Sequence, residues 1–168
     1  MKRFWLGWMA WIAAGAGTAL AADFEVQDAA HLTAALQRAG SGDRVLVYAG
    51  DYTGNWTVPA GVSLLGEPEF IQRAPIRPQF RSNGGAPILT VITSAGSKYP
   101  TQIREIFFNL AKESAIVITG NGTGYVCENF FQENHGVQGG AIYPAASGTL
   151  YFQTIYFMPN TAGADGGA

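Results

Sequence analysis

The acidic residues are the first candidates for chemistry, because paired carboxyl groups carry out much of the acid and base catalysis on sugars. A glycosidase needs two carboxyl groups about 5 to 10 Å apart. A β-elimination needs a base beside a positive charge, which Glu105 with Arg104 or Lys112 could supply; the alternative is a set of solvated surface charges. The second half of the chain contains three repeats, each marked by one asparagine, and no two acids hold the same position relative to that asparagine. The sequence therefore predicts no catalytic residue. The acids compared are Glu105, Glu113, Glu128, Glu133 and Asp165.

The two histidines and the single cysteine do not form a recognisable reactive set. His135 is the best-placed general base, but Leu110 and Thr161 stand at its equivalent positions, so we interpret it as a turn residue. His31 is expected in the first turn of a helix, and Cys127 is expected to be a buried apolar thiol. The sequence has no zinc, calcium, phosphate-loop or dinucleotide signature. It therefore predicts neither a metal nor a cofactor.

A group of aromatic residues near the N-terminus could bind a sugar. Tyr48, Tyr52 and Trp56 lie within one short stretch, and aromatic rings can form a platform for a sugar ring. The alternative is that alternate members pack inside. We predict Tyr52 and Trp56 as possible carbohydrate contacts. The arginines of a Pro-rich segment, residues 67–86, could also meet an acidic polysaccharide; they are Arg73, Arg77 and Arg81.

The elements that would position these side chains repeat along the second half of the chain. Three asparagines recur there at a nearly constant spacing, and an apolar residue precedes each by three positions. A constant period of roughly 20 to 50 residues marks a solenoid, in which each repeat buries its apolar face against its neighbours. The predicted structural ladder consists of Asn109, Asn134 and Asn160 with Ile106, Phe131 and Phe157.

The residue types within the repeats favour strands over helices. Short runs of Phe, Ile, Val and Tyr alternate with Gly, Asn and Ser, and no helix-length apolar pattern is present. Equivalent residues of adjacent turns would lie about 4.8 Å apart, so a repeated Phe forms an aromatic stack and a repeated Asn an amide ladder. The sequence therefore predicts an all-β fold, a right-handed parallel β-helix (solenoid) with an N-terminal capping α-helix. The helix is expected over residues 28–40, and residues 67–86 are expected to form a projecting loop.

Two groups of motifs resemble known β-helical families. Phe131 and Asn134 followed by Gly-Gly-Ala at 139–141 resemble the repeats of polymorphic outer-membrane proteins and related autotransporter passengers of Gram-negative bacteria. The helix, then Gly-Asp-x-Val-x-Val-x-x-Gly-x-Tyr at 42–52 and Gly-Val-x-Leu-x-Gly at 61–66, resembles the cap and first coil of pectate-lyase-like right-handed β-helix proteins. These resemblances imply an exported protein of the outer membrane or cell surface, in adhesin or polysaccharide-related roles.

The N-terminus has the composition of a secretory signal peptide. Lys2 and Arg3 precede an apolar run, and the small residues Ala19 and Ala21 stand at the two positions that a signal peptidase inspects, so residues 1–21 are predicted to be removed. No transmembrane segment is then expected. Removing the two cations changes the formal charge from −2 to −4, which makes nucleic acid or an anionic membrane a poor partner. The protein is expected to be secreted or on the cell surface, most simply of a bacterium.

The remaining residues, 22–168, are expected to form one β-helix domain truncated at its C-terminal end. The alternative is that its open end pairs with another chain in end-to-end self-association. The leading prediction is a non-catalytic protein for adhesion or carbohydrate binding, with a polysaccharide or host-surface ligand. The rival prediction is the N-terminal part of a polysaccharide lyase or glycosidase.

Overall fold

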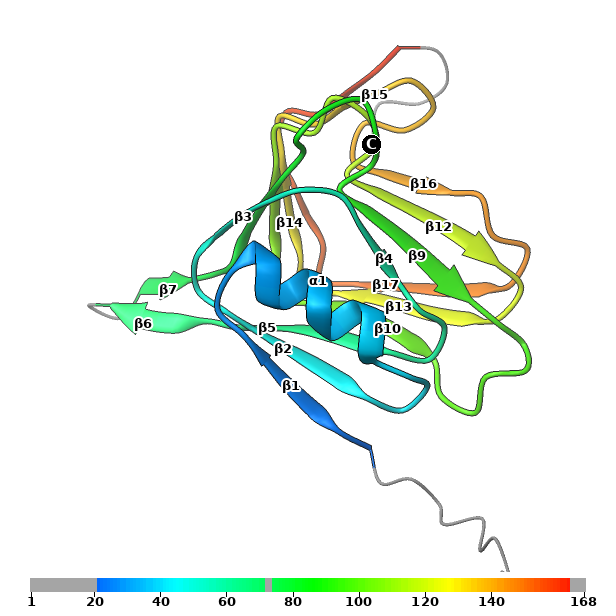
Figure 1. Cartoon of the computed structure of the whole chain (residues 1–168). Coiled ribbons are helices and arrows are strands. Elements are labelled where there is room, and N and C mark those ends of the chain that lie inside the picture. The colour runs from blue at the N-terminus through cyan, green and yellow to red at the C-terminus, as the bar shows by residue number, and fades with distance from the viewer. Residues whose placement is uncertain (1–20, 72–73, 164–168) are drawn as a thin grey trace, which may run out of the picture.

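The computed structural model describes residues 21–71 and 74–163, and these are mostly β-strand with one α-helix (Figure 1). The predicted signal peptide falls outside the described residues, except for its last residue, Ala21. The structure confirms a mostly β chain with parallel sheets and one helix. Within the described part, no helix has the length and apolar character needed to cross a bilayer.

Fifteen strands form three parallel sheets. Sheet A has the order β1 (Asp23–Val26), β2 (Arg44–Tyr48), β5 (Ser63–Glu67), β10 (Thr101–Arg104), β13 (Thr123–Cys127) and β17 (Thr149–Gln153). Sheet B has the order β3 (Asp51–Thr53), β8 (Gln79–Arg81), β11 (Phe107–Asn109), β14 (Phe130–Gln132) and β18 (Tyr156–Phe157). Sheet C has the order β4 (Trp56–Val58), β9 (Leu89–Thr93), β12 (Ile116–Gly120) and β16 (Ile142–Pro144).

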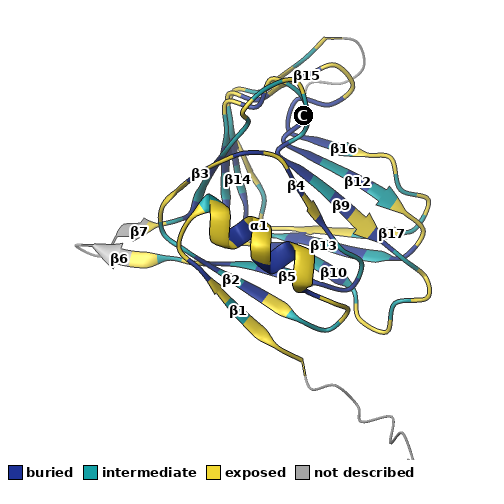
Figure 2. Cartoon of the chain, viewed as in Figure 1, coloured by how far each residue is buried: buried dark blue, intermediate teal, exposed yellow. Residues whose placement is uncertain are grey.

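The chain visits sheets A, B and C in turn and then returns to sheet A beside its earlier strand. We call one such passage a circuit. Along each strand, buried and outward side chains alternate, as in β13, where Gly124 and Val126 are buried and their neighbours are not. Since successive side chains of a strand point to opposite faces, every circuit contributes one apolar face to a shared core (Figure 2).

One aromatic column runs through the core on sheet B. Each ring packs on the ring of the next circuit, with centroids 5.1 to 5.7 Å apart. The column consists of Tyr52, Phe80, Phe108, Phe131 and Phe157. We call it the inner column. It contains Phe131 and Phe157, as the predicted ladder requires, but Phe108 takes the place that the sequence analysis gave to Ile106.

The predicted ladder is displaced in its first repeat because one circuit is shorter than the asparagine spacing indicated. Phe131 pairs with Phe108 before it and with Phe157 after it, and Phe108 is the nearer of the two along the sequence. Asn109 therefore lies opposite Gln132 and not in the column of Asn134. Ile106 is buried in the core, but at the bend between sheets A and B. Placing Ile106 and Asn109 in the ladder was wrong.

Two buried asparagines hold the bends between sheets. Asn134 Oδ1 accepts from the amide of Ala111 at 3.0 Å, and its Nδ2 donates to Asn160 Oδ1 at 2.9 Å. Asn129, which the sequence analysis missed, accepts from the amide of Ile106 at 3.0 Å and donates to the carbonyl of Ile103 at 2.9 Å. Each side chain thus satisfies backbone groups that a bend leaves without a strand partner.

The bends also require left-handed backbone at equivalent positions. Glu105, Glu128 and Thr154 follow the strands of sheet A in successive circuits, with φ of 58°, 57° and 52°. Leu110 and Glu133 do the same after sheet B. Such a conformation costs a non-glycine residue about 1 to 2 kcal/mol, so the hydrogen bonds of the buried asparagines offset a real strain.

The helix α1 (Ala29–Arg38) lies across one end of the stacked circuits, as predicted (Figure 1). Asp28 caps it by accepting from the amide of His31 at 2.8 Å. Leu32, Ala35 and Leu36 form its buried stripe, and the exposed stripe faces away from the core (Figure 2).

The Pro-rich segment differs from the predicted loop. It forms an antiparallel hairpin of β6 (Glu69–Ile71) and β7 (Ala74–Ile76), followed by β8 in sheet B. The hairpin projects from the circuits at the bend between sheets A and B (Figure 1). Two further short strands, β15 (His135–Gly136) and β19 (Thr161–Ala162), pair in parallel beyond sheet B.

Candidate functional site

The outward face of sheet A places chemically distinct side chains in columns, because its strands are parallel and in register. Tyr125 on β13 faces Tyr151 on β17, and Gln102 on β10 precedes them in the same column. Beside this column, Cys127 lies between Arg104 and Gln153. Every second residue of each strand thus reaches the same outward surface.

Tyr125 and Tyr151 form a flat aromatic surface on this face. Their ring centroids are 4.8 Å apart and their planes differ by 12°. Tyr151 is 49% exposed and Tyr125 is half-buried. Stacked rings present an apolar face while their hydroxyl groups stay available for hydrogen bonds.

Two depressions adjoin this stack, and Tyr125 lines both. One, of about 250 Å³, is lined by amide and charged side chains, including Gln102, Gln153, Arg104 and Glu128. The other, of about 670 Å³, lies along the bends that lead from sheet C to sheet A. Its polar lining includes Ser94, Ser97, Lys98, Tyr99, Asn121, Thr123, Ser147 and Thr149. The surface thus combines an apolar ring stack with many neutral hydrogen-bonding groups.

The bend beside the smaller depression brings two acids into one column. Glu105 and Glu128 hold equivalent positions of successive circuits, since Arg104 pairs with Cys127. The expectation that no two acids share a position was therefore wrong, and the cause is the shorter circuit. The same displacement that removed Asn109 from its predicted column placed these carboxyl groups together.

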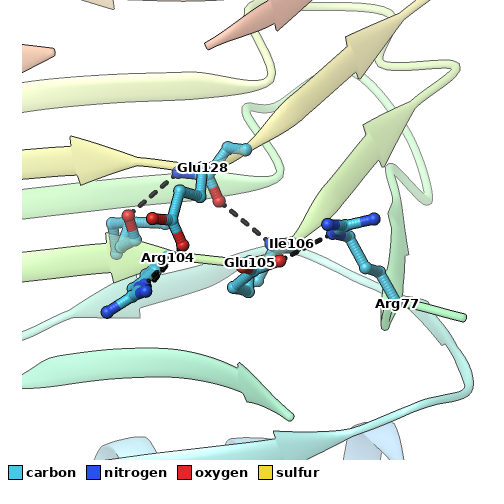
Figure 3. Close-up of polar contacts among 7 residues, drawn as sticks. Arg77, Arg104, Glu105, Ile106 and Glu128 are labelled. Atoms are coloured by element: carbon cyan, nitrogen blue, oxygen red, sulfur yellow. Dashed lines mark hydrogen bonds and ion pairs between the residues drawn. The ribbon is translucent and has the colours of Figure 1, made fainter. Parts of the chain in front are cut away.

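Two arginines flank the acids (Figure 3). Arg77 Nε donates to Glu105 at 2.7 Å, and Arg104 Nε donates to Glu128 at 2.8 Å. A side-chain hydrogen bond with Glu105, and then one from Arg104, hold the pKa of Glu128 below its ordinary value. The bond to Glu128 raises the pKa of Arg104 in return.

This acidic pair is poorly arranged for hydrolysis of a glycosidic bond. Hydrolysis needs one carboxyl group to act as a protonated acid, whereas each carboxyl group here accepts a hydrogen bond from an arginine. A carboxylate whose pKa is lowered is also a weak base at neutral pH. Both arginines are already engaged with acids, so the cluster stabilises the bend through paired charges.

A second outward aromatic column lies on sheet B, across the bend. Phe107, Phe130 and Tyr156 follow one another, with centroid distances of 6.4 and 4.4 Å. Arg77 lies over the ring of Phe130 at 4.3 Å. A depression of about 260 Å³ opens beside them, lined in part by Gln79. This column is more apolar than the tyrosine stack and has fewer hydrogen-bonding neighbours.

The predicted carbohydrate contacts are not on the surface. Tyr52 is 0% exposed in the inner column, and its hydroxyl group donates to the carbonyl of Tyr48 at 2.9 Å. Trp56 is 8% exposed, and its Nε1 donates to Thr33 of α1 at 3.0 Å. The prediction of a sugar platform at Tyr52 and Trp56 was wrong, because both side chains point into the core.

The two histidines and the cysteine considered in the sequence analysis lie among residues that give them structural roles. His135 pairs through Nδ1 with the hydroxyl group of Thr161 on the adjacent short strand, and His31 lies 2.9 Å from the capping Asp28. Cys127 is half-buried on the outward face, not in the core as expected, and burial raises the pKa of its thiol. Among residues 21–71 and 74–163, no three His, Cys, Asp or Glu side chains gather in a group that could hold a metal.

Sequence reasoning missed the tyrosine stack, although a signal for it was present. Tyr125 and Tyr151 are as far apart along the sequence as Phe131 and Phe157. The search for repeated positions followed the asparagine and its nearest neighbours only. Extending the same spacing upstream would have aligned the two tyrosines.

Comparison with known proteins leaves this surface to be interpreted from its own geometry. No protein-family model, no curated protein and no solved structure matches the chain.

Proposed function

We propose that the circuits are coils of a right-handed parallel β-helix of the pectate-lyase-like type, with α1 as its N-terminal cap. The ordered passage through three parallel sheets supports this fold. The inner aromatic column and the hydrogen bond between the side-chain amides of Asn134 and Asn160 also support it. The right hand follows from the general bias of parallel crossover connections.

We propose that this protein binds a polysaccharide on the outward face of sheet A. The observation that carries the proposal is the exposed Tyr125–Tyr151 stack between two polar depressions. Sugar rings have apolar C–H faces that pack on aromatic rings and hydroxyl edges that need hydrogen-bond partners. The tyrosine stack supplies the first, and the amides of Gln102 and Gln153 with the neighbouring hydroxyl groups supply the second.

The binding face would accept an extended chain more readily than a small molecule. The larger depression, the tyrosine stack and the smaller depression adjoin one another through Tyr125. Lys98 is the charged residue of the larger depression, and the arginine of the smaller one is paired with Glu128. Neutral or weakly acidic polysaccharides therefore fit this face better than highly charged ones.

The test is binding of the purified protein to a panel of neutral and uronate-containing polysaccharides, by affinity electrophoresis. Tyr151→Ala should abolish the retardation of the best ligand. Tyr156→Ala is the matched control, because Tyr156 is equally exposed, lies in the same circuit and also stacks on an aromatic neighbour. Equal losses in both variants, or no ligand in the panel, would overturn the assignment of the tyrosine stack.

A second candidate function is cleavage of a polysaccharide, as a lyase or glycosidase. The specific observation in its favour is that Glu105 and Glu128 share one column, with Arg77 and Arg104 beside them. Incubating polysaccharides with the protein and measuring unsaturated products and new reducing ends tests it. Products that disappear in Glu128→Gln would make the bend an active site and displace the binding proposal.

We propose that the protein acts outside the cytoplasm, at the cell surface or in the medium, as an adhesin or a glycan-binding protein. The composition of residues 1–21 supports export. Mass spectrometry of the protein recovered from cell fractions checks this. A mature N-terminus at Ala22 in exported material supports the proposal, and an intact Met1 in the cytoplasmic fraction contradicts it.

A further inference from the structure

Lys98 brings a positive charge, without an acidic partner, to the larger depression on the outward face of sheet A. Four arginines among the described residues each form an ion pair with an acid; they are Arg44, Arg77, Arg81 and Arg104. No described carboxylate lies within ion-pair distance of the Lys98 ammonium group, and the described residues that line the depression include no Asp or Glu. The charge of Lys98 is therefore available to a ligand.

Hydrogen bonds fix the loop that carries Lys98, residues 94–100, which is longer than the equivalent bend between β12 and β13 (Figure 1). The hydroxyl group of Ser97 donates to the carbonyl of Tyr99 at 2.8 Å, and it also pairs with the hydroxyl group of Ser41 at 2.8 Å. The residues on both sides of Lys98 are thus held in place before a ligand binds, so binding has less of the chain to order.

The ring of Tyr99 supports the side chain of Lys98. The ring packs against Gly42, where the Cβ of any other residue would lie 2.9 Å from Tyr99 Cε2. Tyr99 stays 45% exposed, and the Lys98 ammonium group lies 5.3 Å from its ring centroid, within the range of a cation–π contact. The ammonium group is therefore positioned at the depression, which both residues line.

The rest of the depression supplies neutral hydrogen-bonding groups. Its volume of about 670 Å³ lies within the range of about 300 to 1,000 Å³ that is typical of ligand sites. A carboxylate accepts about four hydrogen bonds through its two oxygens; the ammonium group of Lys98 would donate some of them and neighbouring hydroxyl groups the others. These hydroxyl groups include those of Ser94, Thr123, Ser147 and Thr149. One carboxylate balances one lysine, whereas a densely sulfated polymer would add charges that this acidic protein does not neutralise.

We propose that the larger depression binds a uronate unit of the polysaccharide, and that Lys98 determines this specificity by pairing with the carboxylate. The inference rests on the proposed binding function, because Tyr125 joins the depression to the tyrosine stack. A neutral sugar unit stacks on the tyrosines equally well, but it forms no ion pair with Lys98. The tyrosine stack thus supplies affinity for sugar chains in general, and Lys98 selects those that carry a carboxylate.

The test compares one uronate-containing polysaccharide with the same polymer after its carboxyl groups have been reduced to alcohols, by affinity electrophoresis at low and high salt. The wild type should bind the uronate form about tenfold more tightly, and salt should diminish this difference. Lys98→Gln should lose the difference by weakening binding of the uronate form only, and its unchanged binding of the reduced form shows that it is folded. Tyr151→Ala should abolish binding of both forms, since both stack on the tyrosines.

Lys112→Gln is the matched control, because it removes the same charge from an exposed lysine that lines neither depression. It should keep the preference for the uronate form. Equal binding of both forms by the wild type, with Tyr151→Ala still abolishing it, would overturn the role of Lys98 and leave the proposed function standing. Equal losses in the two lysine variants would also overturn that role. Absence of binding to either form would overturn the proposed function and this inference together.

Discussion

The inner column and the outward aromatic columns are built on the same strands with the same spacing, yet they have different consequences. On β14, Phe131 lies in the inner column and Phe130 lies in the outward column, one residue apart. Both rings stack on the next circuit, at 5.5 and 4.4 Å. The two differ in what surrounds the stack: side chains of the core on one face, solvent and polar groups on the other.

Because of this difference in surroundings, the inner rings contribute to stability, whereas the outward rings form part of the protein surface. A buried ring contributes through the apolar surface that it removes from water and through close packing, and its loss leaves a cavity. An outward ring keeps much of its surface in contact with solvent, so its removal changes the stability little. A ligand could displace the water that covers it. The molecule thus uses one repeated motif to hold the circuits together on the inside and to present a surface on the outside.

Truncation of the inner column is the largest expected effect. Phe131→Ala should lower the free energy of unfolding by about 3 to 5 kcal/mol, because Phe131 is fully buried between two other rings. Phe130→Ala, on the same strand, should cost about 1 kcal/mol, mostly lost ring stacking. Chemical denaturation of the two variants measures both, and equal losses would break the distinction between inner and outward columns.

Alkaline pH tests the burial of Tyr52 at the end of the inner column. Burial, and then the charge of Asp28, raise the pKa of Tyr52 from 10.0 to about 12. Above pH 10 the unfolded chain loses this proton while the folded protein keeps it, so the stabilising difference is lost as pH rises towards 12. The loss should approach roughly 2 to 3 kcal/mol.

Tyr52→Phe is the control for this alkaline loss. It removes the hydroxyl group and its bond to the carbonyl of Tyr48, which should cost about 1 kcal/mol at neutral pH. Its stability should then fall less steeply than that of the wild type between pH 10 and 12. Parallel curves for the two proteins would show that Tyr52 is not buried in the folded state.

The hydrogen bonds of the asparagine side chains at the bends should contribute an intermediate amount to the free energy of unfolding. Asn134→Ala leaves the amide of Ala111 and the carbonyl of Phe108 without their side-chain partner, and we expect a loss of about 1 to 3 kcal/mol. Asn109→Ala should cost less than about 0.5 kcal/mol, because Asn109 lies outside that column. A loss below about 0.3 kcal/mol for Asn134→Ala would contradict the bend's dependence on this side chain.

The contrast between Asn109 and Asn134 also shows how far sequence could predict this fold. Residue types and the near-constant asparagine spacing were enough to predict strands, parallel sheets and the helix at 28–40. The register of the preceding circuit was not predictable from that spacing, because the bend needs only a backbone amide opposite Asn134. Ala111 supplies that amide as well as an asparagine would, so nothing in the side chains marked the shorter circuit.

The candidate site was missed for a related reason. Outward side chains of parallel strands come together only after the register is known, so Glu105 and Glu128 appeared to hold different positions until the circuit length was corrected. Tyr52 and Trp56 were misplaced for another reason. The two residues are separated by an even number of positions, and each is a buried residue of a short strand. The residues next to them on these strands, Asp51, Thr53 and Thr57, face outward. Strand alternation alone could have assigned these two residues to the core.

The smallest expected effect is the loss of stability at acid pH that comes from Glu128, on the outward side of the bend. The pKa of Glu128 is lowered in the folded protein, first by its hydrogen bond with Glu105 and then by Arg104. Its stabilising contribution is therefore present above the ordinary pKa of 4.5 and is lost as pH falls through the lower folded value. Denaturation midpoints measured across this range should fall less steeply for Glu128→Gln than for the wild type. If the two proteins lose stability in parallel, the acidic bend is a solvated surface feature that does not contribute measurably to folding.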